Sequence, residues 1–285
     1  MFKKVFIVLF FLFLLFGATS LIFMAWGYYY VTRDLPELFS AADYKPPIVS
    51  SVYAADGTLV AEFWKEKRYP VKLDEIPKLV KDAFIAAEDA SFYVHPGLDP
   101  MSIARAALAN LKTGEASQGG STITQQVVKN LLLSPEKKII RKIKEAILAY
   151  RIEKRLSKDE ILEIYFNQIF FGNQAYGVKA ASFAYFQKEL KDLNLAEASM
   201  LAGLPKAPSK FSPLKNYNRA KRRQAYVLDQ MVKAGFVSRE EADGALDVKL
   251  NLHRATARKI FDAPYYVDEV QRVILEKWKD YDLES

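Results

Sequence analysis

The chain has 285 residues, and its 41 Lys and Arg residues against 34 Asp and Glu residues give a formal net charge of +7. This positive excess favours an anionic partner, such as an anionic lipid or a phosphorylated substrate. With no Cys and only two His residues, the sequence excludes disulfide bonds, thiolate chemistry and a histidine-rich metal site. Any metal ion would have to be a hard cation held by carboxylates.

The chain begins with a long apolar run. No charged residue lies between Lys4 and Arg33. This uncharged run is longer than the roughly 20 apolar residues that a helix needs to cross the hydrocarbon core. Aromatic residues, Trp26 and Tyr28–Tyr30, gather at its end, as they do at lipid headgroups. Lysines precede the run and acidic residues follow it, so the N-terminus is expected in the cytoplasm. A cleaved signal peptide is the alternative, but its apolar region would be shorter. An exported location argues against nucleic acid as a partner.

After the apolar run, residues 33–70 predict a linker and a small β-hairpin. The linker is polar and contains Pro46-Pro47, and β-branched residues flank Asp56-Gly57, a common hairpin turn. From residue 71 to about 250 the apolar residues recur at helical spacing, which predicts eight or nine helices around one core. Good start signals support this, including S-x-x-E capping boxes that begin at Ser157 and Ser238 and an Asp-Pro pair at Asp99.

The segment EDASFYVHPG, residues 88–97, contains two adjacent carboxylates. The apolar run before Glu88 predicts that Glu88 and Asp89 lie at a helix C-terminus. Apolar surroundings and the negative end of a helix dipole both disfavour an ionised carboxylate, so the pKa of Glu88 is expected to be raised. Such a group suits a general base that works near neutral pH. The ordinary alternative is a solvated helix end, and for His95 a structural hydrogen bond is the simpler role.

A second polar segment, QGGSTITQQVVKN at residues 118–130, combines glycines with hydroxyl and amide groups. Ser121 or Thr122 can cap a new helix there. A helix N-terminus that follows a glycine-rich turn presents free N–H groups and a positive dipole to an anion. Lys129 and Asn130 lie about two turns further on. The alternative is an ordinary junction between a loop and a helix.

A third segment, RKIKE at residues 141–145, lies in a long basic helix. Arg141 and Glu145 are four residues apart and therefore share one face of that helix. A surface ion pair is the alternative. Beside Glu88, however, Glu145 would supply a second carboxylate and Arg141 a fork that binds phosphate.

These segments belong to a set of blocks that occur in a fixed order. They are E-D-x-x-F-x-x-H-x-G at 88–97, G-G-S-T-I-T-Q-Q at 119–126, R-K-x-x-E at 141–145, KDEILEIYFNQIFFG at 158–172, AYGVKAA at 175–181 and LAEASMLAGLPKAPSKFSP at 195–213. Together they resemble the glycosyltransferase module of class A penicillin-binding proteins, the peptidoglycan polymerases. The similarity covers residue 46 to the end, and the departures at Phe166, Gln187 and Ser199 touch none of the proposed chemistry.

The resemblance implies roles for individual residues. Glu88 would be the general base that takes the proton from the 4-hydroxyl of the incoming lipid II, and Glu145 the second catalytic carboxylate. Attack on the growing chain would invert its anomeric carbon from α to β and release undecaprenyl pyrophosphate. The remaining residues would bind substrate: Lys129 and Arg141 at the leaving pyrophosphate, Thr122, Gln126 and Asn130 along the donor site, and Asp89, Phe92 and His95 in support of Glu88.

The resemblance also implies the architecture and the setting. The fold would be mainly α, a lysozyme-like glycosyltransferase domain with a small β-hairpin region and one N-terminal transmembrane helix. The parts would be an anchor (1–32), a linker and hairpin (33–70), the glycosyltransferase domain (71–250) and the start of a linker (251–285) to a transpeptidase domain that we expect to be missing. The location would be the bacterial inner membrane, single-pass, with the catalytic domain periplasmic or extracellular.

The expected partners are lipid II, the growing glycan chain, the membrane and other cell-wall synthesis proteins, with no nucleic acid. A divalent cation, Mg²⁺ or Mn²⁺, is the one cofactor that the resemblance leaves open, and Glu145 is its candidate ligand. Two other functions stay open from the sequence. A lysozyme-like lytic glycosidase would also use a helical fold and a catalytic Glu, although a neutral glycan leaving group needs no cations. A role as a non-catalytic cell-wall scaffold would not explain the sequence pattern of the blocks at residues 88–97 and 119–126.

Overall fold

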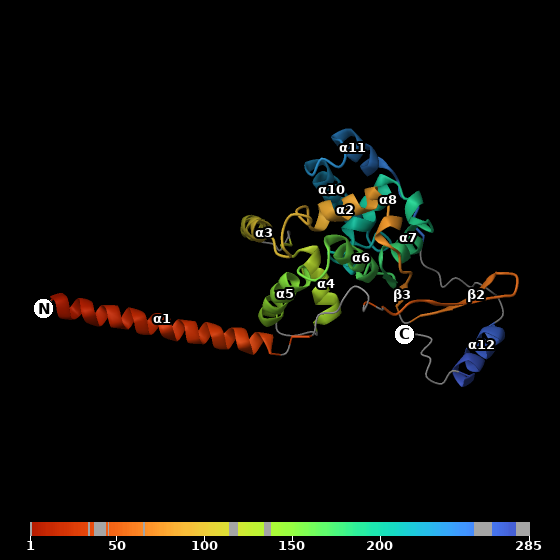
Figure 1. The fold of residues 1–285 in the computed structure, drawn as a ribbon. Helices are drawn as coiled ribbons and strands as arrows, with labels where there is room; N and C mark the ends of the chain where they lie inside the picture. Colours follow the sequence, from red (N-terminus) through yellow and green to blue (C-terminus); the bar gives the residue numbers. More distant parts are fainter. Residues whose placement is uncertain are drawn as a thin grey trace.

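The computed structural model describes residues 2–33, 35–36, 44, 46–64, 66–113, 119–133, 138–253 and 264–277 (Figure 1). Most of these residues are helical, which confirms the mainly α fold class. The helices are α1 (Phe2–Thr32), α2 (Lys78–Glu88), α3 (Pro100–Thr113), α4 (Ile123–Leu132), α5 (Lys138–Ile152), α6 (Lys158–Gln168), α7 (Val178–Phe186), α8 (Leu195–Gly203), α9 (Pro208–Phe211), α10 (Tyr217–Lys233), α11 (Arg239–Asp247) and α12 (Pro264–Lys277). Two short 3₁₀ helices are η2 (Leu73–Glu75) and η3 (Leu190–Asp192).

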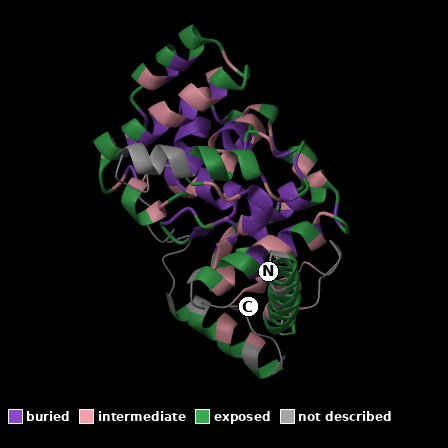
Figure 2. Cartoon of the chain, turned by 90° about the vertical axis from the view of Figure 1, so that its left-hand side faces the viewer, coloured by how far each residue is buried: buried purple, intermediate pink, exposed green. Residues whose placement is uncertain are grey.

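The N-terminal helix α1 stands apart from the rest of the molecule. It extends away from the globular body (Figure 1), and its side chains are almost all exposed (Figure 2). Within the described residues, it is the one helix long and apolar enough to cross a membrane. Only its C-terminal end approaches the body: the Arg151 guanidinium of α5 donates a hydrogen bond to the Tyr28 hydroxyl at 3.4 Å. The predicted apolar helix at the N-terminus is thus confirmed.

The core of the globular body surrounds α8. Every residue of this helix from Ala196 to Gly203 is buried, as expected for a short helix that is apolar on all sides. It packs against α2 and α10, which in turn contact each other, and α6 packs against α4. Figure 2 shows this buried centre, with exposed residues confined to the outer turns. The packing leaves the C-terminal end of α2 and the N-terminal end of α4 to meet at one side of the core.

Four short strands form two small sheets. β1 (Ser50–Tyr53) and β2 (Leu59–Phe63) pair as an antiparallel hairpin, and Gly57 at the turn has a φ of 84°. This confirms the hairpin predicted around Asp56-Gly57. β3 (Lys67–Arg68) pairs in parallel with β4 (Ala175–Tyr176), which ties the segment after the hairpin to the helical body.

Most of the predicted helix starts are confirmed. Ser157 and Ser238 form reciprocal capping boxes at α6 and α11, and Asp99 accepts a hydrogen bond from the Ser102 amide at the start of α3. Between residues 71 and 250 the described part of the chain contains ten α-helices rather than eight or nine, because the four-residue α9 had no periodic pattern of its own. The boundaries predicted for the four parts of the chain stay predictions.

Candidate active site

Residues of α2, α4, α5 and α10 line a cleft, together with the segments before α4 and after α8. It encloses about 210 Å³. Its polar and charged lining residues are Glu88, Ser121, Gln125, Gln126, Lys129, Glu145, Lys206, Arg223 and Tyr226. The cleft therefore combines two carboxylates with three cationic side chains, contributed by five separate segments of the chain.

Glu88 is the last residue of α2, as predicted, and its side chain is only 9% exposed rather than solvated. Its carboxylate accepts a hydrogen bond from the Gln126 amide at 2.8 Å, and the Arg223 guanidinium lies 3.6 Å from its other oxygen. Burial raises the pKa of Glu88, and the positive charge of Arg223 and the Gln126 hydrogen bond only partly oppose this. The expected direction of the pKa is confirmed, and its main cause is burial.

The adjacent carboxylate, Asp89, has its oxygens committed to structural bonds. It accepts hydrogen bonds from His95 Nε2 at 2.9 Å and from the backbone amide of Ile123 at 2.9 Å. Because the Gly97 amide donates to His95 Nδ1, the proton of the neutral ring must sit on Nε2, which faces Asp89. Asp89 and His95 thus connect the loop after α2 to the N-terminus of α4, and His95 forms the structural hydrogen bond expected of it.

The N-terminus of α4 is fixed by a reciprocal capping box. The Thr122 hydroxyl accepts from the Gln125 amide, and the Gln125 side chain accepts from the Thr122 amide. The same hydroxyl donates to the Gly97 carbonyl at 2.6 Å. Of the two cap candidates in the sequence, Thr122 is therefore the one used. The capped end presents Gln126 to Glu88 and, one turn later, Lys129 to the cleft.

Glu145 lies on the opposite wall of the cleft, on α5, and is buried. The Lys142 ammonium lies 2.7 Å from one of its oxygens and the Arg141 Nε atom 3.4 Å from the other. Lys142 also donates to the Ser121 hydroxyl at 2.7 Å, which links α5 to the loop before α4. The pair Arg141–Glu145 predicted by spacing is confirmed, but its carboxylate is not on the surface.

The residues around Glu145 do not fit a resident divalent cation. Both carboxylate oxygens already face cationic nitrogens. Among the described residues, no group of three or more His, Asp or Glu side chains could hold a metal ion. A site for Mg²⁺ or Mn²⁺ usually offers several oxygen ligands.

The structure brings some predicted site residues to the cleft and not others. Glu88, Gln126, Lys129 and Glu145 line it, while Asp89 and Thr122 line the adjoining hollow beside Glu88. The remaining predicted residues do not line either: Phe92 and His95 are buried, Asn130 is exposed at the end of α4, and Arg141 contacts Glu145.

Sequence reasoning missed three polar groups of the cleft, Lys206, Arg223 and Tyr226, and also the hydrogen bond from Lys142 to Ser121. Burial and the neighbouring charge of Arg223 lower the pKa of Lys206, and the charge of Glu88 opposes this shift. Lys206 sits in the block LAGLPKAPS, and that match was the one signal that could have found it. Arg223 is one of several basic residues on α10, and only the packing of that helix selects it.

Comparison with known proteins identifies the family of this chain. A family model described as transglycosylase matches residues 56–232. Penicillin-binding protein 1A of Neisseria flavescens is 46% identical over 244 residues, which is 86% of this chain and 31% of that protein. Penicillin-binding protein 1A of Escherichia coli K12 is 43% identical over 278 residues, or 97% of this chain and 32% of that protein.

Among solved structures, penicillin-binding protein 1A from Haemophilus influenzae matches with 28% identity and a TM-score of 0.48, covering 85% of this chain and 25% of that one. The chain spans about a third of the length of the curated relatives it matches. The chain belongs to the transglycosylase family, and it carries the glycosyltransferase module of class A penicillin-binding proteins.

Proposed function

We propose that this chain polymerises lipid II into β-1,4 glycan strands. The observation that carries the proposal is the Glu88 carboxylate, on a side chain only 9% exposed, which shares one cleft with Lys129, Lys206 and Arg223. A buried Glu with a raised pKa can take a proton from a sugar hydroxyl. Binding of neutral sugars does not require three cationic side chains. Two pyrophosphate groups, one on the donor and one on the acceptor, do offer negative charge for these cations to bind.

In the proposed reaction, ionised Glu88 removes the proton from the acceptor 4-hydroxyl, and the oxygen attacks the anomeric carbon of the donor. The bond between that carbon and the pyrophosphate oxygen breaks as the new bond forms on the opposite face, so the configuration inverts. The Gln126 amide orients the base. Undecaprenyl pyrophosphate leaves with both electrons of the broken bond.

Two sets of cations fit the two pyrophosphates. Lys129, with Arg141 and Lys142 around Glu145, would stabilise the leaving group on the α5 side of the cleft. Lys206 and Arg223 lie on the Glu88 side, where they would hold the acceptor and bring its 4-hydroxyl to the base. Glu145 would then act as the carboxylate that orients Arg141 and Lys142.

We also propose that α1 spans the bacterial inner membrane with the N-terminus in the cytoplasm. Lys3 and Lys4 support this orientation, and the helix is 31 residues long, enough to cross the bilayer. The helical body would then lie on the outer face, where a substrate carried on a lipid is held in the same leaflet.

The experiment is to incubate the detergent-solubilised chain with labelled lipid II and to separate the products by size. Long strands, with one undecaprenyl pyrophosphate released for each new β linkage, are expected. If no strand forms but preformed glycan is shortened, the chain is a lytic glycosidase, for which a buried Glu with a raised pKa would also serve as general acid. Binding without any turnover would identify a scaffold.

A further inference from the structure

Tyr165 on α6 has a buried hydroxyl group without a hydrogen-bond partner. The residue is 1% exposed, and its hydroxyl is one of four buried side-chain atoms that lack such a partner among the described residues. Buried phenol hydroxyls are normally hydrogen-bonded, because an unsatisfied polar group in the interior costs free energy. An orphaned hydroxyl next to a reaction site therefore calls for a functional explanation.

The Tyr165 ring packs on the face of α2 that carries Glu88. The centroid of the Tyr165 ring lies 6.4 Å from the centroid of the Phe84 ring, and the two rings meet edge to face. Phe84 and Glu88 are four residues apart on α2 and so lie on the same side of that helix. Oε1 of Glu88 is another of the four buried atoms without a hydrogen-bond partner. The Arg223 guanidinium lies 3.6 Å from it, beyond hydrogen-bond distance.

Electrostatics agree that the two groups are neighbours. Burial raises the pKa of the Tyr165 hydroxyl well above its usual value, and the next contributions come from the carboxylates of Glu88 and Asp89. The phenol therefore keeps its proton throughout the working pH range and can only donate it in a hydrogen bond. Asp89 already accepts from His95 and Ile123, which leaves Glu88 as the acceptor with an open position.

We propose that Tyr165 is a positioning residue whose hydroxyl donates a hydrogen bond to a buried water that donates to Oε1 of Glu88, and that it thereby favours the ionised form of Glu88. The inference deepens the proposed function, because it assigns a residue that controls when the base is active. A donor that bonds the charged form of an acid lowers the pKa of that acid. Tyr165 would thus counter part of the burial that keeps Glu88 protonated.

Other groups face Glu88 and stay in place when Tyr165 changes. Arg223 on α10, Gln126 on α4 and Lys206 after α8 each favour its ionised form, whereas Asp89 disfavours it. Loss of the hydroxyl alone should therefore raise the pKa of Glu88 by about one unit, the size expected for one hydrogen bond to a charged group.

The test is the pH dependence of kcat/KM for lipid II polymerisation in the whole chain. In Tyr165→Phe, the acidic limb should move to higher pH by about one unit, while the rate on the alkaline plateau stays within a few-fold of the unchanged chain. The matched control is Tyr185→Phe, which also removes a buried hydroxyl, one that donates to the Phe171 carbonyl away from the cleft. This control should lose stability without moving the limb. An unmoved limb in Tyr165→Phe, or a shift to lower pH, overturns the proposal.

A second variant tests the opposite sign. Replacing Tyr165 with 3-fluorotyrosine, a more acidic phenol and a stronger donor, should move the limb to lower pH. The Glu88 carboxyl can also be titrated directly by infrared difference spectra between the chain and Glu88→Gln, with and without Tyr165→Phe. This readout needs no turnover, so it separates the outcomes: absence of polymerisation by the unchanged chain rejects the proposed function, whereas an unchanged Glu88 titration rejects the role of Tyr165.

Discussion

Glu88 and Asp89 show how two adjacent carboxylates can acquire different properties. Asp89 accepts hydrogen bonds from His95 and from the Ile123 amide. Glu88, with a side chain 9% exposed, accepts one side-chain amide, from Gln126. Burial therefore dominates at Glu88 and raises its pKa. The difference depends on which donors the fold supplies, because the two residues are neighbours in the chain.

We expect Glu88→Gln to abolish polymerisation and at the same time to stabilise the fold. Because the folded-state pKa of Glu88 is raised, its ionised form costs free energy in the folded chain above that pKa. The stability of the chain therefore falls as pH rises from the pKa of Glu88 in the unfolded chain through its pKa in the folded chain. The neutral amide of the variant avoids this cost, even though Arg223 loses its ion-pair partner. Turnover should drop at least about 100-fold, and the melting temperature at pH 8 should rise by a few degrees.

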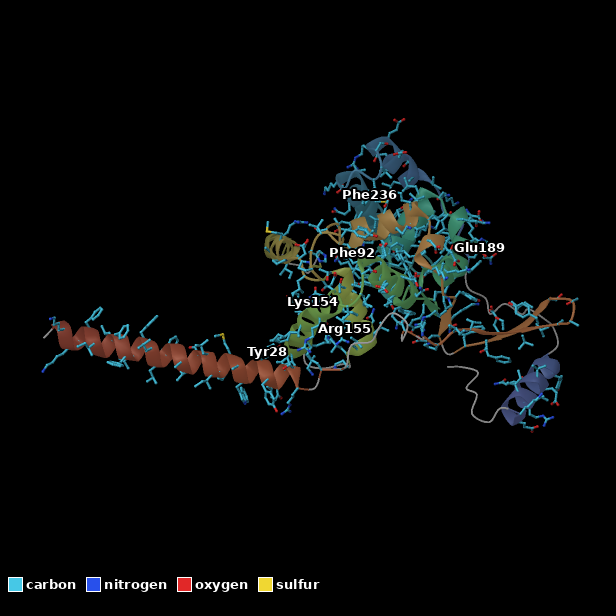
Figure 3. The ribbon with its side chains drawn as sticks, in the orientation of Figure 1. Tyr28, Phe92, Lys154, Arg155, Glu189 and Phe236 are labelled. Atoms are coloured by element: carbon cyan, nitrogen blue, oxygen red, sulfur yellow. The ribbon has the colours of Figure 1, made fainter. Side chains whose placement is uncertain are left out.

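The matched control is Glu189→Gln, which neutralises an exposed carboxylate on the surface of the body (Figure 3). Turnover and melting temperature should both stay unchanged in that variant. A Glu88→Gln chain that still polymerises, or that melts lower than the unchanged chain at pH 8, would contradict the role or the environment assigned to Glu88.

Arg141→Ala should weaken substrate use more than folding. The Arg141 side chain is 29% exposed and lies 3.4 Å from Glu145, so its ion pair contributes at most about 1 kcal/mol to stability. A lost phosphate contact should instead raise KM for lipid II by about tenfold or more. Arg272→Ala on α12 is the control, since that exposed arginine pairs only with Glu269 and Glu276 in the described part of the chain. Equal KM values for the two variants would argue against a phosphate at Arg141.

At the residue scale, local pattern predicted part of the site. The apolar approach to Glu88 and the spacing of Arg141 and Glu145 are short-range signals, and both predictions hold in the structure. The positions of Arg223 and Tyr165 relative to Glu88 depend instead on how α10 and α6 pack against α2. No local pattern contains that information, because many basic or aromatic residues on those helices satisfy the same periodicity.

At the scale of elements, the loop after α2 and the helix α5 are in close contact. Gly97 has a φ of 90°, and a Cβ atom there would lie 2.7 Å from the Ala149 carbonyl oxygen on α5. The same loop binds the α4 cap through the Gly97 carbonyl and Thr122. Gly97 therefore allows three elements of the site, the loop, α4 and α5, to approach one another.

Gly97→Ala should destabilise the chain by at least about 2 kcal/mol in urea unfolding, because it adds a backbone clash to an unfavourable φ. Gly235→Ala provides the comparison: its φ is 73°, but nothing lies within 4 Å of the added Cβ. That variant should cost only about 1 kcal/mol. Equal losses in the two variants would show that the contact with α5 is not tight.

Helix starts were the elements most readily predicted, because a cap is a local hydrogen bond between residues three apart. The capping boxes at Ser157 and Ser238 are examples. The short α9 and the parallel pairing of β3 with β4 were not predicted. The strands of that pair are two residues each and lie more than 100 residues apart in the chain, so neither carries a pattern that reveals its partner.

At the scale of the whole molecule, α1 meets the site-bearing helix α5. The Tyr28 hydroxyl of α1 accepts a hydrogen bond from Arg151 at the C-terminal end of α5. Exposed apolar side chains, Ile139, Ile143 and Tyr150, also follow one face of α5. The proposed membrane span and the cleft are thus connected through a single helix.

A chain shortened to begin at Leu35 should fold with an unchanged melting temperature, because none of the α1 side chains whose burial is described belongs to the core. In vesicles that contain lipid II it should polymerise more slowly than the full chain, whereas in detergent the two rates should agree. Equal rates in vesicles would show that α1 is a tether without influence on catalysis, and a lower melting temperature would show that it supports the fold.

The contact between α1 and α5 has a kinetic consequence for the proposed enzyme. If α1 spans the bilayer as proposed, the chain tethers the cleft to its surface beside the contact of Tyr28 with Arg151, and encounters with substrate become a search in two dimensions. Turnover should then follow the number of lipid II molecules per unit area rather than per unit volume. Adding inert phospholipid to the vesicles would slow the reaction at constant bulk concentration, and diluting the vesicle suspension with buffer would leave the turnover of each enzyme unchanged.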